Sequence, residues 1–290
     1  MLFLSNWFLH KMTGKWDEDL VSVIMPVYKT EKGLLSQSIK SILDQDYENL
    51  ELIIVEDPSS CLANPIIKNF NDPRICYFIN ETRTSFAYQL NLGLAKSKGE
   101  FVARMDADDI SEPARIGLQY KFMKQHSEVS VVGTNLKIIS GSNKEIGLRL
   151  YPETSMKIAG RMRLESAIAH PSVMCRKKDI LNCGGFDPAF GMVADYDLWC
   201  RMILAGKNFY NLQQPLLRYR IHAQASKVTS LKKTIRATMA IKRRYFKGKK
   251  GLWGSKEALR YQLEKFLLFL PPRLVLKMFI ILSFKRLSQE

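Results

Sequence analysis

The sequence contains few cysteines, and none of them in a pairing pattern. There are five, an odd number, and no two are spaced as Cys-x-x-Cys. This usage argues against a disulfide framework and against a thiolate zinc site. We therefore expect a protein suited to a reducing cytosol.

Apolar runs long enough to cross a bilayer, which takes about 20 residues, are also missing. The most apolar stretch near the end of the sequence, residues 266–282, is interrupted by Arg273, Lys277 and a pair of prolines. The first nine residues are mostly apolar, but they precede any positive charge and lack a small-residue cleavage site, so they match a signal peptide poorly. We expect no membrane-spanning segment and no signal peptide.

Acidic residues are scarce near the end of the sequence. Residues 231–290 contain 16 lysines and arginines but only 3 glutamates, so most of the formal net charge of +16 lies there. A basic tail can bind nucleic acid or an anionic membrane, or be a solvated surface. Because apolar patches lie between the cations, we favour an interfacial membrane helix over a helical pair that packs back on the domain.

Several common catalytic motifs are absent. We find no Walker loop, no His-Glu-x-x-His helix and no Gly-x-Ser-x-Gly elbow. A Gly-rich, Arg-containing phosphate loop, which normally opens a sugar nucleotidyltransferase, does not follow the first apolar run. That enzyme class and a nucleic-acid-binding protein remain alternative interpretations, although the basic tail is all that nucleic-acid binding would explain.

Strand and helix patterns alternate over the first part of the chain. The predicted strands cover residues 20–27, 50–55, 75–79 and 101–105, and the predicted helices cover residues 34–43, 66–70 and 86–95. Such alternation predicts an α/β fold with a parallel sheet covered by helices. Ligands of such sheets bind beyond the carboxyl ends of the strands, where Tyr28, Asp57 and Asp106 fall.

The second part is less regular. We expect a helix over 113–126, a strand over 129–132, looser β structure or a loop over 133–151, and further strands over 169–174 and 210–221. The only plausible boundary is a composition shift near Val228. We predict an N-terminal extension over residues 1–19, one domain over 20–228, and a basic, apolar helical region over 229–290.

The most informative stretch is an apolar strand that ends in Asp106, Asp108 and Asp109. Carboxylates one residue apart at a strand end can converge on Mg²⁺ or Mn²⁺, which complete their coordination with water and substrate phosphates. The stretch therefore points to a nucleoside diphosphate. Short acidic clusters are also typical of solvated loops and helix caps, and we interpret Asp109, which lies just before Pro113, as such a structural cap.

The acidic stretch belongs to a series of motifs. The series comprises Val21–Tyr28, Ser41–Tyr47, Glu51–Asp57, Lys98–Asp109, Gly184–Asp187 and Ala194–Arg201. In this order the motifs closely resemble the family-2 glycosyltransferases with the GT-A fold, a Rossmann-like, mostly parallel sheet flanked by helices. The resemblance covers about residues 20–222.

This resemblance implies an inverting enzyme that moves a hexosyl or N-acetylhexosaminyl group from a nucleotide-sugar, with UDP as the expected nucleotide. The implied acceptor is a hydroxyl of a saccharide or lipid-linked saccharide in surface polysaccharide synthesis. Together with the basic, apolar tail, it places the protein in the cytoplasm, peripherally on the cytoplasmic face of the inner membrane.

The resemblance also implies a nucleotide site. Asp57 would accept the imide N–H of uracil, although an Asp before Pro58 can also simply start a turn. The other residues expected around the nucleotide are Pro26, Tyr28, Glu56, Asn91 and Asp106.

For the metal, Mg²⁺ or Mn²⁺, the resemblance implies Asp108 and Asp106 as ligands. His222 would close over the diphosphate or the metal. Arg218 and Arg220 share one strand face, which can meet phosphate or water, and the sequence does not decide between these.

The position of the catalytic base matches Asp195. A hydroxyl that attacks an anomeric carbon must lose its proton, and a positioned carboxylate can accept it. Asp195 could instead cap a helix, and Asp197 is a rival base that we interpret as a partner of the helix dipole. Trp199 is either a core residue or a platform for a sugar.

Overall fold

The computed structural model describes residues 17–60, 62–221, 226–272, 274–275 and 285–286. Within them, the strands are β1 (Asp17–Val27), β2 (Leu50–Glu56), β3 (Ile75–Ile79), β4 (Gly99–Arg104), β5 (Ile110–Ser111), β6 (Val129–Ile139), β7 (Glu145–Arg149), β8 (Met174–Arg176), β9 (Asn208–Arg220) and β10 (Lys285–Arg286). The α-helices are α2 (Lys32–Leu43), α3 (Asn64–Phe70), α4 (Phe86–Lys96), α5 (Arg115–Gln125), α6 (Ser155–Met162), α7 (Lys177–Asn182), α8 (Ala194–Leu204), α9 (Ser226–Tyr245) and α10 (Ser255–Leu267). Two 3₁₀ segments are η1 (His170–Ser172) and η2 (Pro188–Val193).

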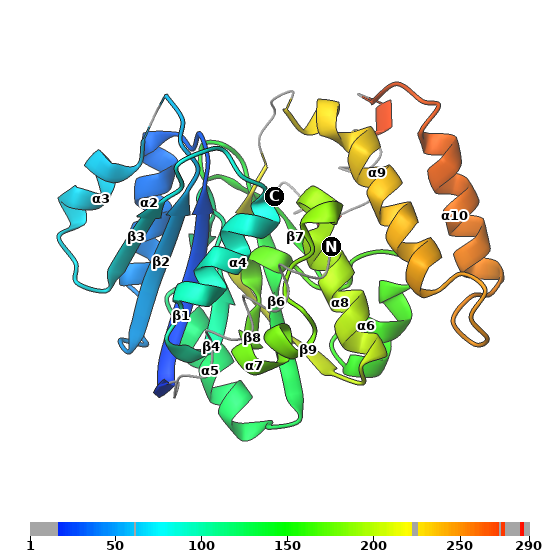
Figure 1. Ribbon diagram of the computed structural model, residues 1–290, viewed down its shortest axis with the longest axis horizontal. Helices are drawn as coiled ribbons and strands as arrows, with labels where there is room; N and C mark the ends of the chain where they lie inside the picture. The colour runs from blue at the N-terminus through cyan, green and yellow to red at the C-terminus, as the bar shows by residue number, and fades with distance from the viewer. Residues whose placement is uncertain (1–16, 61, 222–225, 273, 276–284, 287–290) are drawn as a thin grey trace.

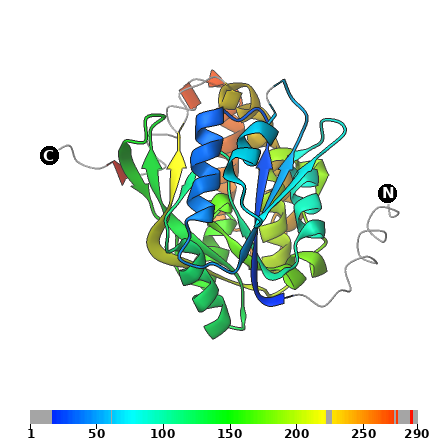
Figure 2. The same ribbon diagram turned by 90° about the vertical axis from the view of Figure 1, so that its left-hand side faces the viewer.

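The parallel part of the sheet is built around β1. This strand pairs in parallel with β2 on one side and β4 on the other, and β3 continues the parallel order beyond β2. Alternate residues of β1 face opposite layers, as the pleat requires: Val23 and Met25 enter one core and Ile24 the other. Figure 2 shows α2 and α4 on opposite sides of these strands. The predicted alternation of strands and helices is confirmed here.

The rest of the sheet is mostly antiparallel, so the sheet as a whole is mixed. β8 pairs antiparallel with both β4 and β6, β6 forms a hairpin with β7, and β9 runs parallel to β6. The stretch 133–151 is therefore mainly a β-hairpin. The prediction of a strand over 169–174 was wrong, because Pro171 has no N–H to donate and the chain forms the turn η1 before β8 begins at Met174.

Two hydrophobic cores lie on the two faces of the sheet. Helices α2 and α5 cover the first core, with Ile39 and Ile116 fully buried. Helices α4, α6, α7 and α8 cover the second core, where Trp199 is 0% exposed. Of the two interpretations of Trp199, the structure selects the core residue.

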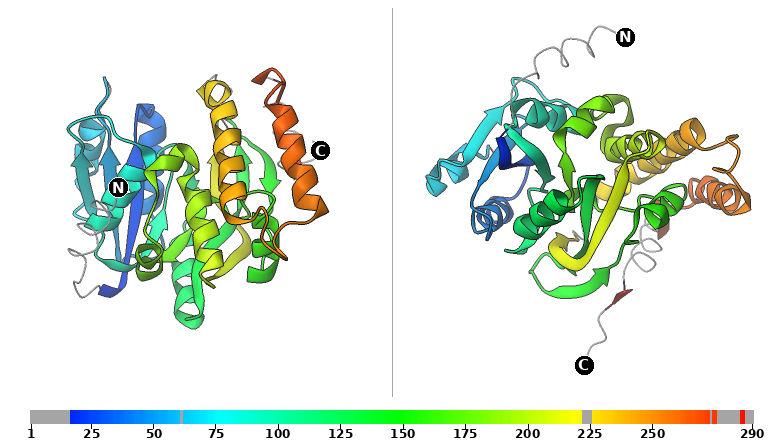
Figure 3. Two further views of the ribbon diagram at one scale, coloured as in Figure 1. Left: turned by 45° about the vertical axis from the view of Figure 1, so that its right-hand side comes forward. Right: turned by 90° about the horizontal axis from the view of Figure 1, so that it is seen from below.

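The two basic helices at the end of the described chain pack against the domain. Ile241 of α9 and Phe246, just after this helix, are buried in the second core. Helix α10 lies on the outer side of α9 (Figures 1 and 3). The Lys242 ammonium of α9 is 2.5 Å from the Glu264 carboxylate of α10, and both side chains are buried. The region after the expected boundary near residue 228 thus shares a core with the domain before it. Among the helices of the described residues, none is both long and apolar enough to span a membrane.

Candidate active site

The carboxyl ends of β1, β2 and β4 lie side by side. Val27 is opposite Glu56, and Ile24 is opposite Arg104. Tyr28 and Asp57 follow their strands directly, and Asp106 follows Arg104 after one residue, so all three lie at the same edge of the sheet. This is the edge at which open α/β sheets bind their ligands.

Asp57 is buried and organises the loop that follows β3. One carboxylate oxygen accepts hydrogen bonds from the Asn80 amide at 2.8 Å and the Thr84 hydroxyl at 2.7 Å, and the other accepts from the Thr84 backbone N–H at 2.8 Å. A carboxylate has about four acceptor positions, so one remains for a ligand. The sequence analysis did not identify Asn80 and Thr84, whose role depends on contacts made across the fold.

Tyr28 lies at the mouth of this edge, half-buried, and Pro26 is buried within β1. The guanidinium of Arg83 lies 4.5 Å from the centre of the Tyr28 ring, and the Lys29 ammonium lies 5.4 Å from it. Both cations are exposed and lie beside Tyr28 at the strand edge. Arg83 is a further candidate contact for a diphosphate, and no motif in the sequence identifies it.

Two residues expected at the nucleotide have structural partners instead. Glu56 is 0% exposed, and its carboxylate accepts hydrogen bonds from the Ala63 backbone and the Tyr77 hydroxyl. Asn91 exchanges two hydrogen bonds with the backbone of Phe186, at 2.8 and 3.0 Å. Glu56 thus holds the loop after β2, and Asn91 holds a turn, while their contact with a nucleotide stays a prediction.

The turn held by Asn91 leads into α8. Gly184 and Gly185 both have positive φ, +84° and +67°, a conformation that glycine adopts without strain. A Cβ on Gly185 would lie 2.9 Å from the Asn91 side-chain oxygen. The Gly-Gly-Phe-Asp motif therefore fixes the approach of the chain to Asp195.

The acidic turn after β4 brings three carboxylates together. Oxygens of Asp106, Asp108 and Asp109 lie within 4.8 Å of one another. Asp109 is 1% exposed; its Oδ1 accepts a hydrogen bond from the Arg220 backbone N–H, and its Oδ2 has no hydrogen-bond partner among the described residues. Burial and the two neighbouring carboxylates raise the pKa of Asp109 well above its usual value.

This carboxylate group fits a hard divalent cation. It offers oxygen donors only, and the unpartnered Asp109 oxygen and the mutual repulsion of the carboxylates are both relieved by a bound cation. The interpretation of Asp109 as a helix cap was wrong, because α5 begins at Arg115 with Ala114 as its N-cap residue. Asp109 instead accepts a hydrogen bond from the Arg220 backbone of β9, and it is also a candidate ligand. His222 lies outside the described residues.

The acidic turn is held from two sides. The Arg220 guanidinium, 1% exposed, donates to the Asp108 carbonyl at 2.7 Å and to Asn143 at 2.5 Å, and the Ser38 hydroxyl of α2 donates to the Asp106 carbonyl at 2.8 Å. Arg218 pairs with Glu112 at 2.9 Å. Arg220 therefore contacts the turn itself, whereas Arg218 pairs with a carboxylate and keeps 37% of its side chain exposed.

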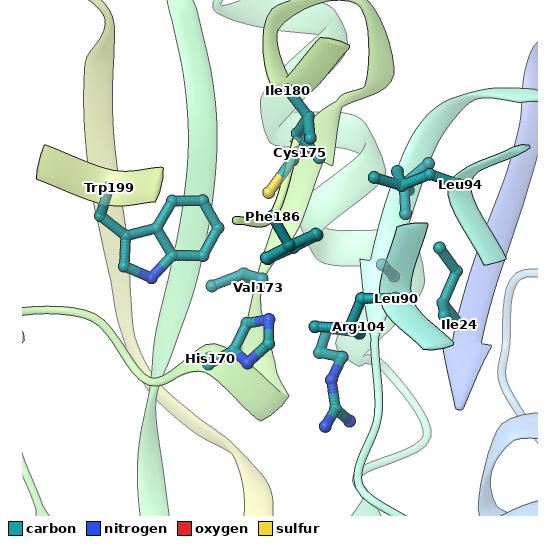
Figure 4. A pocket seen from close by; sticks show the side chains of 12 residues that line it. Ile24, Leu90, Leu94, Arg104, His170, Val173, Cys175, Ile180, Phe186 and Trp199 are labelled. Atoms are coloured by element: carbon teal, nitrogen blue, oxygen red, sulfur yellow. The ribbon is translucent and has the colours of Figure 1, made fainter. Parts of the chain in front are cut away.

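Arg104 connects the acidic turn with the second core. It is 4% exposed, and its guanidinium lies 2.5 Å from Asp106, while its Nε and Nη1 have no hydrogen-bond partner among the described residues. Figure 4 shows Arg104 with His170 and Trp199 around a cavity of about 20 Å³. The cavity has room for about one water molecule and is therefore too small to be the substrate pocket.

Asp195 lies in the first turn of α8, with its side chain 19% exposed. Its carboxylate is 3.8 Å from His170 Nδ1, beyond hydrogen-bond distance. Burial raises the pKa of Asp195 to about 6, while a backbone hydrogen bond from Tyr196 and the Arg104 guanidinium oppose the rise. Burial and Arg104 lower the pKa of His170 well below its usual value, so His170 is neutral at pH 7. A half-buried carboxylate with a raised pKa is suited to proton transfer.

Asp197, the alternative candidate for the base, is fully buried, and both of its carboxylate oxygens have partners. Its Oδ2 pairs with Arg201 at 2.6 Å, and its Oδ1 accepts from the Tyr245 hydroxyl at 2.7 Å. With both oxygens engaged and no exposure, Asp197 links α8 to α9. Of the two aspartates, Asp195 is the one that can meet a substrate.

The fold and the strand-edge carboxylates are those of a GT-A glycosyltransferase. The family model for "Glycosyl transferase family 2" matches residues 22–184, more than half of the chain. The chain belongs to this family, and it is a glycosyltransferase. This membership sets aside the nucleotidyltransferase and nucleic-acid-binding alternatives as the main activity.

Similar proteins fall in the same class. The O-antigen biosynthesis glycosyltransferase WbnJ of Escherichia coli is 35% identical over 223 residues, which cover 73% of this chain and 84% of WbnJ. The UDP-Glc:alpha-D-GlcNAc-diphosphoundecaprenol beta-1,3-glucosyltransferase WfgD of Escherichia coli is 31% identical over 187 residues, which cover 64% of this chain and 71% of WfgD. The mannosyltransferase PcManGT from Pyrobaculum calidifontis, solved with GDP-Man and Mn²⁺, has a TM-score of 0.60 at 16% identity, covering 97% of this chain and 87% of that chain.

Proposed function

We propose that this protein transfers a hexosyl or N-acetylhexosaminyl group from a UDP-sugar to a hydroxyl of a lipid-linked saccharide, with inversion at the anomeric carbon. The observation that carries the proposal is the joint position of Asp57 and the acidic turn at one strand edge, with Asp195 approaching from α8. A base site, a diphosphate site and a proton acceptor are what this reaction requires.

The donor would bind along the strand edge. Asp57 retains an acceptor position for the imide of uracil, and Arg83 and Lys29 offer positive charge near Tyr28. Asp106, Asp108 and Asp109 would hold Mg²⁺ or Mn²⁺. The bound cation would supply charge neutralisation for the diphosphate as it leaves. WfgD, by its name, uses UDP-Glc, which favours a uridine nucleotide here.

Asp195 would act as the general base. As the acceptor oxygen forms its bond to the anomeric carbon, its proton passes to the Asp195 carboxylate, and the bond from the anomeric carbon to the UDP oxygen breaks. Attack from the face opposite UDP inverts the configuration. The neutral His170 would leave the carboxylate as the stronger base of the two.

The acceptor proposal draws on the relatives and on the tail. WfgD acts on a diphosphoundecaprenol-linked sugar, and WbnJ serves O-antigen biosynthesis, as their names state. A lipid-linked acceptor places the reaction at a membrane surface. We accordingly propose a cytoplasmic protein that works peripherally on the inner membrane, in surface polysaccharide synthesis.

A donor-hydrolysis screen tests the proposal. Purified protein is incubated with a panel of nucleotide-sugars and Mg²⁺ or Mn²⁺, and release of the nucleotide is measured with and without candidate acceptors. We expect one UDP-sugar to be preferred. Asp195→Asn should lower acceptor-dependent turnover by at least about a hundredfold with little change in donor affinity, because the amide cannot take the proton.

The unfolding temperature of the Asp195→Asn variant shows whether a loss of turnover could come from misfolding. Because burial raises the pKa of Asp195, its ionised form destabilises the folded protein at neutral pH, so the variant should unfold at the same temperature or higher. Near-normal turnover in a folded Asp195→Asn variant, or an α-linked product from an α-linked donor, would contradict the proposed mechanism.

A further inference from the structure

One face of α10 and of the turn after it carries large apolar side chains that nothing in the described structure covers. These residues are Leu259, Leu263, Phe266 and Phe269, with 73%, 45%, 57% and 83% of their surfaces exposed. Their spacing of four, three and three residues places them on one side of a helix. We refer to these four residues as the α10 stripe.

Packing on the opposite face fixes the stripe toward the outside. Tyr261, Glu264 and Leu267 are buried against α9. Two contacts fix the orientation of α10 about its own axis. One is the buried ion pair of Lys242 with Glu264, and the other is the ring contact of Tyr261 with Trp253. The stripe is therefore on the face of α10 that does not pack against α9. Figure 3 shows α10 itself on the outer side of the helix pair.

The exposed charges of α10 and of the segment that leads into it have one sign. Outside this segment, Glu165 of the domain pairs with Arg260 of α10 at 3.3 Å. Between residues 243 and 270, every exposed charged side chain is a lysine or arginine: Arg243, Arg244, Lys247, Lys249, Lys250, Lys256 and Lys265. The two acidic residues in this span, Glu257 and Glu264, are buried and already engaged, with Gly254 and with Lys242 respectively. An apolar centre with basic flanks results.

We propose that the α10 stripe and its flanking cations form a docking surface for an anionic membrane. In such a surface the apolar side chains enter the boundary between headgroups and acyl chains, and each nearby cation contributes about 1 kcal/mol. A nucleic acid would match the cations but would leave four large apolar side chains unburied. The inference deepens the proposed function, on which its biological purpose rests, by naming the surface that brings the enzyme to a lipid-linked acceptor.

The test is co-sedimentation of the full chain with vesicles of phosphatidylcholine containing phosphatidylglycerol. The wild-type protein should sediment with these vesicles and much less with phosphatidylcholine alone. Replacing all four stripe residues by serine should lower partitioning by at least about tenfold. Lys256→Gln with Lys265→Gln should reduce the preference for phosphatidylglycerol, because it removes two flanking charges.

A matched control replaces Leu150 and Met156, which are 52% and 82% exposed but outside α10, by serine and should leave partitioning unchanged. Donor hydrolysis should be normal in all variants, so failure of the vesicle result is distinct from failure of the proposed activity. Wild-type protein that stays in solution, or a stripe variant that still sediments, would overturn the proposal. So would a wild-type dimer that the stripe substitutions dissociate, since the occupant would then be a second copy.

Discussion

Among single residues, Arg104 interacts with both the acidic turn and Asp195. Its guanidinium contacts Asp106 of the acidic turn, and its charge lowers the pKa of both Asp195 and His170. It is a positioning residue: it contacts Asp106 directly and acts on Asp195 only through its charge, and it is itself 4% exposed. The groups that act electrostatically on Asp195 include Arg104 and Asp106, which have opposite effects, and the buried His170 faces it at 3.8 Å.

This arrangement predicts a pH dependence. The base must be ionised, so turnover should rise roughly tenfold per pH unit up to about pH 6 and level off above it. In Arg104→Met the nearby cation is lost, so the ionised form of Asp195 is less favoured and the midpoint should move to higher pH. Arg104→Lys, which keeps the charge, should stay near the wild-type midpoint. Turnover measured across pH decides this, and a midpoint that is identical in the Met and Lys variants would contradict it.

Between elements, the contact of α8 with α9 matters most for the site. Asp197 on α8 pairs with Arg201 one turn later and with the Tyr245 hydroxyl of α9, so the helix that carries Asp195 rests against the basic C-terminal pair. Arg244 of α9 also lies 5.7 Å from the ring of Phe190, in the segment η2 that precedes Asp195. Removing residues 231–290 would therefore remove Ile241 and Phe246 from the second core and leave the part of the core that packs against them uncovered.

Tyr245→Phe tests this link at small structural cost. The buried Asp197 carboxylate would lose one of its hydrogen bonds, and we expect a loss of about 1–2 kcal/mol in the free energy of unfolding. Tyr210→Phe is the control, because Tyr210 donates to Glu153 in a less buried place and its loss should cost less. Chemical denaturation of the two variants measures the difference. Equal losses of unfolding free energy in the two variants would mean that the hydrogen bond between Tyr245 and Asp197 contributes no more to stability than a less buried one.

Over the whole molecule, the sequence predicted what depends on local pattern. The alternation of strands and helices, together with the acidic turn at a strand end, was enough to locate Tyr28, Asp57 and Asp106 at one edge. It did not predict partners that lie far along the chain. Arg220 supports Asp109 across 111 residues, and Asn91 meets Phe186 across 95. A motif gives the residue type at a position, but it does not give the partners of the side chain, and so the contacts of Glu56 with Ala63 and of Asn91 with Phe186 could not be predicted.

The packing of the tail also depends on contacts that the sequence does not show. Its composition, basic and apolar, is compatible with both packing and membrane contact, and the sequence analysis treated the two as alternatives. The structure shows that Lys242, Tyr261 and Glu264 pack between the helices, while the α10 stripe is exposed, and membrane contact stays a prediction. Only the three-dimensional pairing of α9 with α10 separates these faces.

The central claim is that the acidic turn binds a nucleoside diphosphate through a divalent cation. Calorimetric titration of UDP into the protein, with and without Mn²⁺, tests it most directly, because it needs neither the sugar nor the acceptor. We predict tight binding that requires Mn²⁺ and is lost in Asp108→Ala, whereas Asp44→Ala, which removes an exposed carboxylate paired with Lys40 at the far end of α2, should bind as the wild type does. Equal UDP affinity with and without Mn²⁺, or an unchanged affinity in Asp108→Ala, would contradict the account.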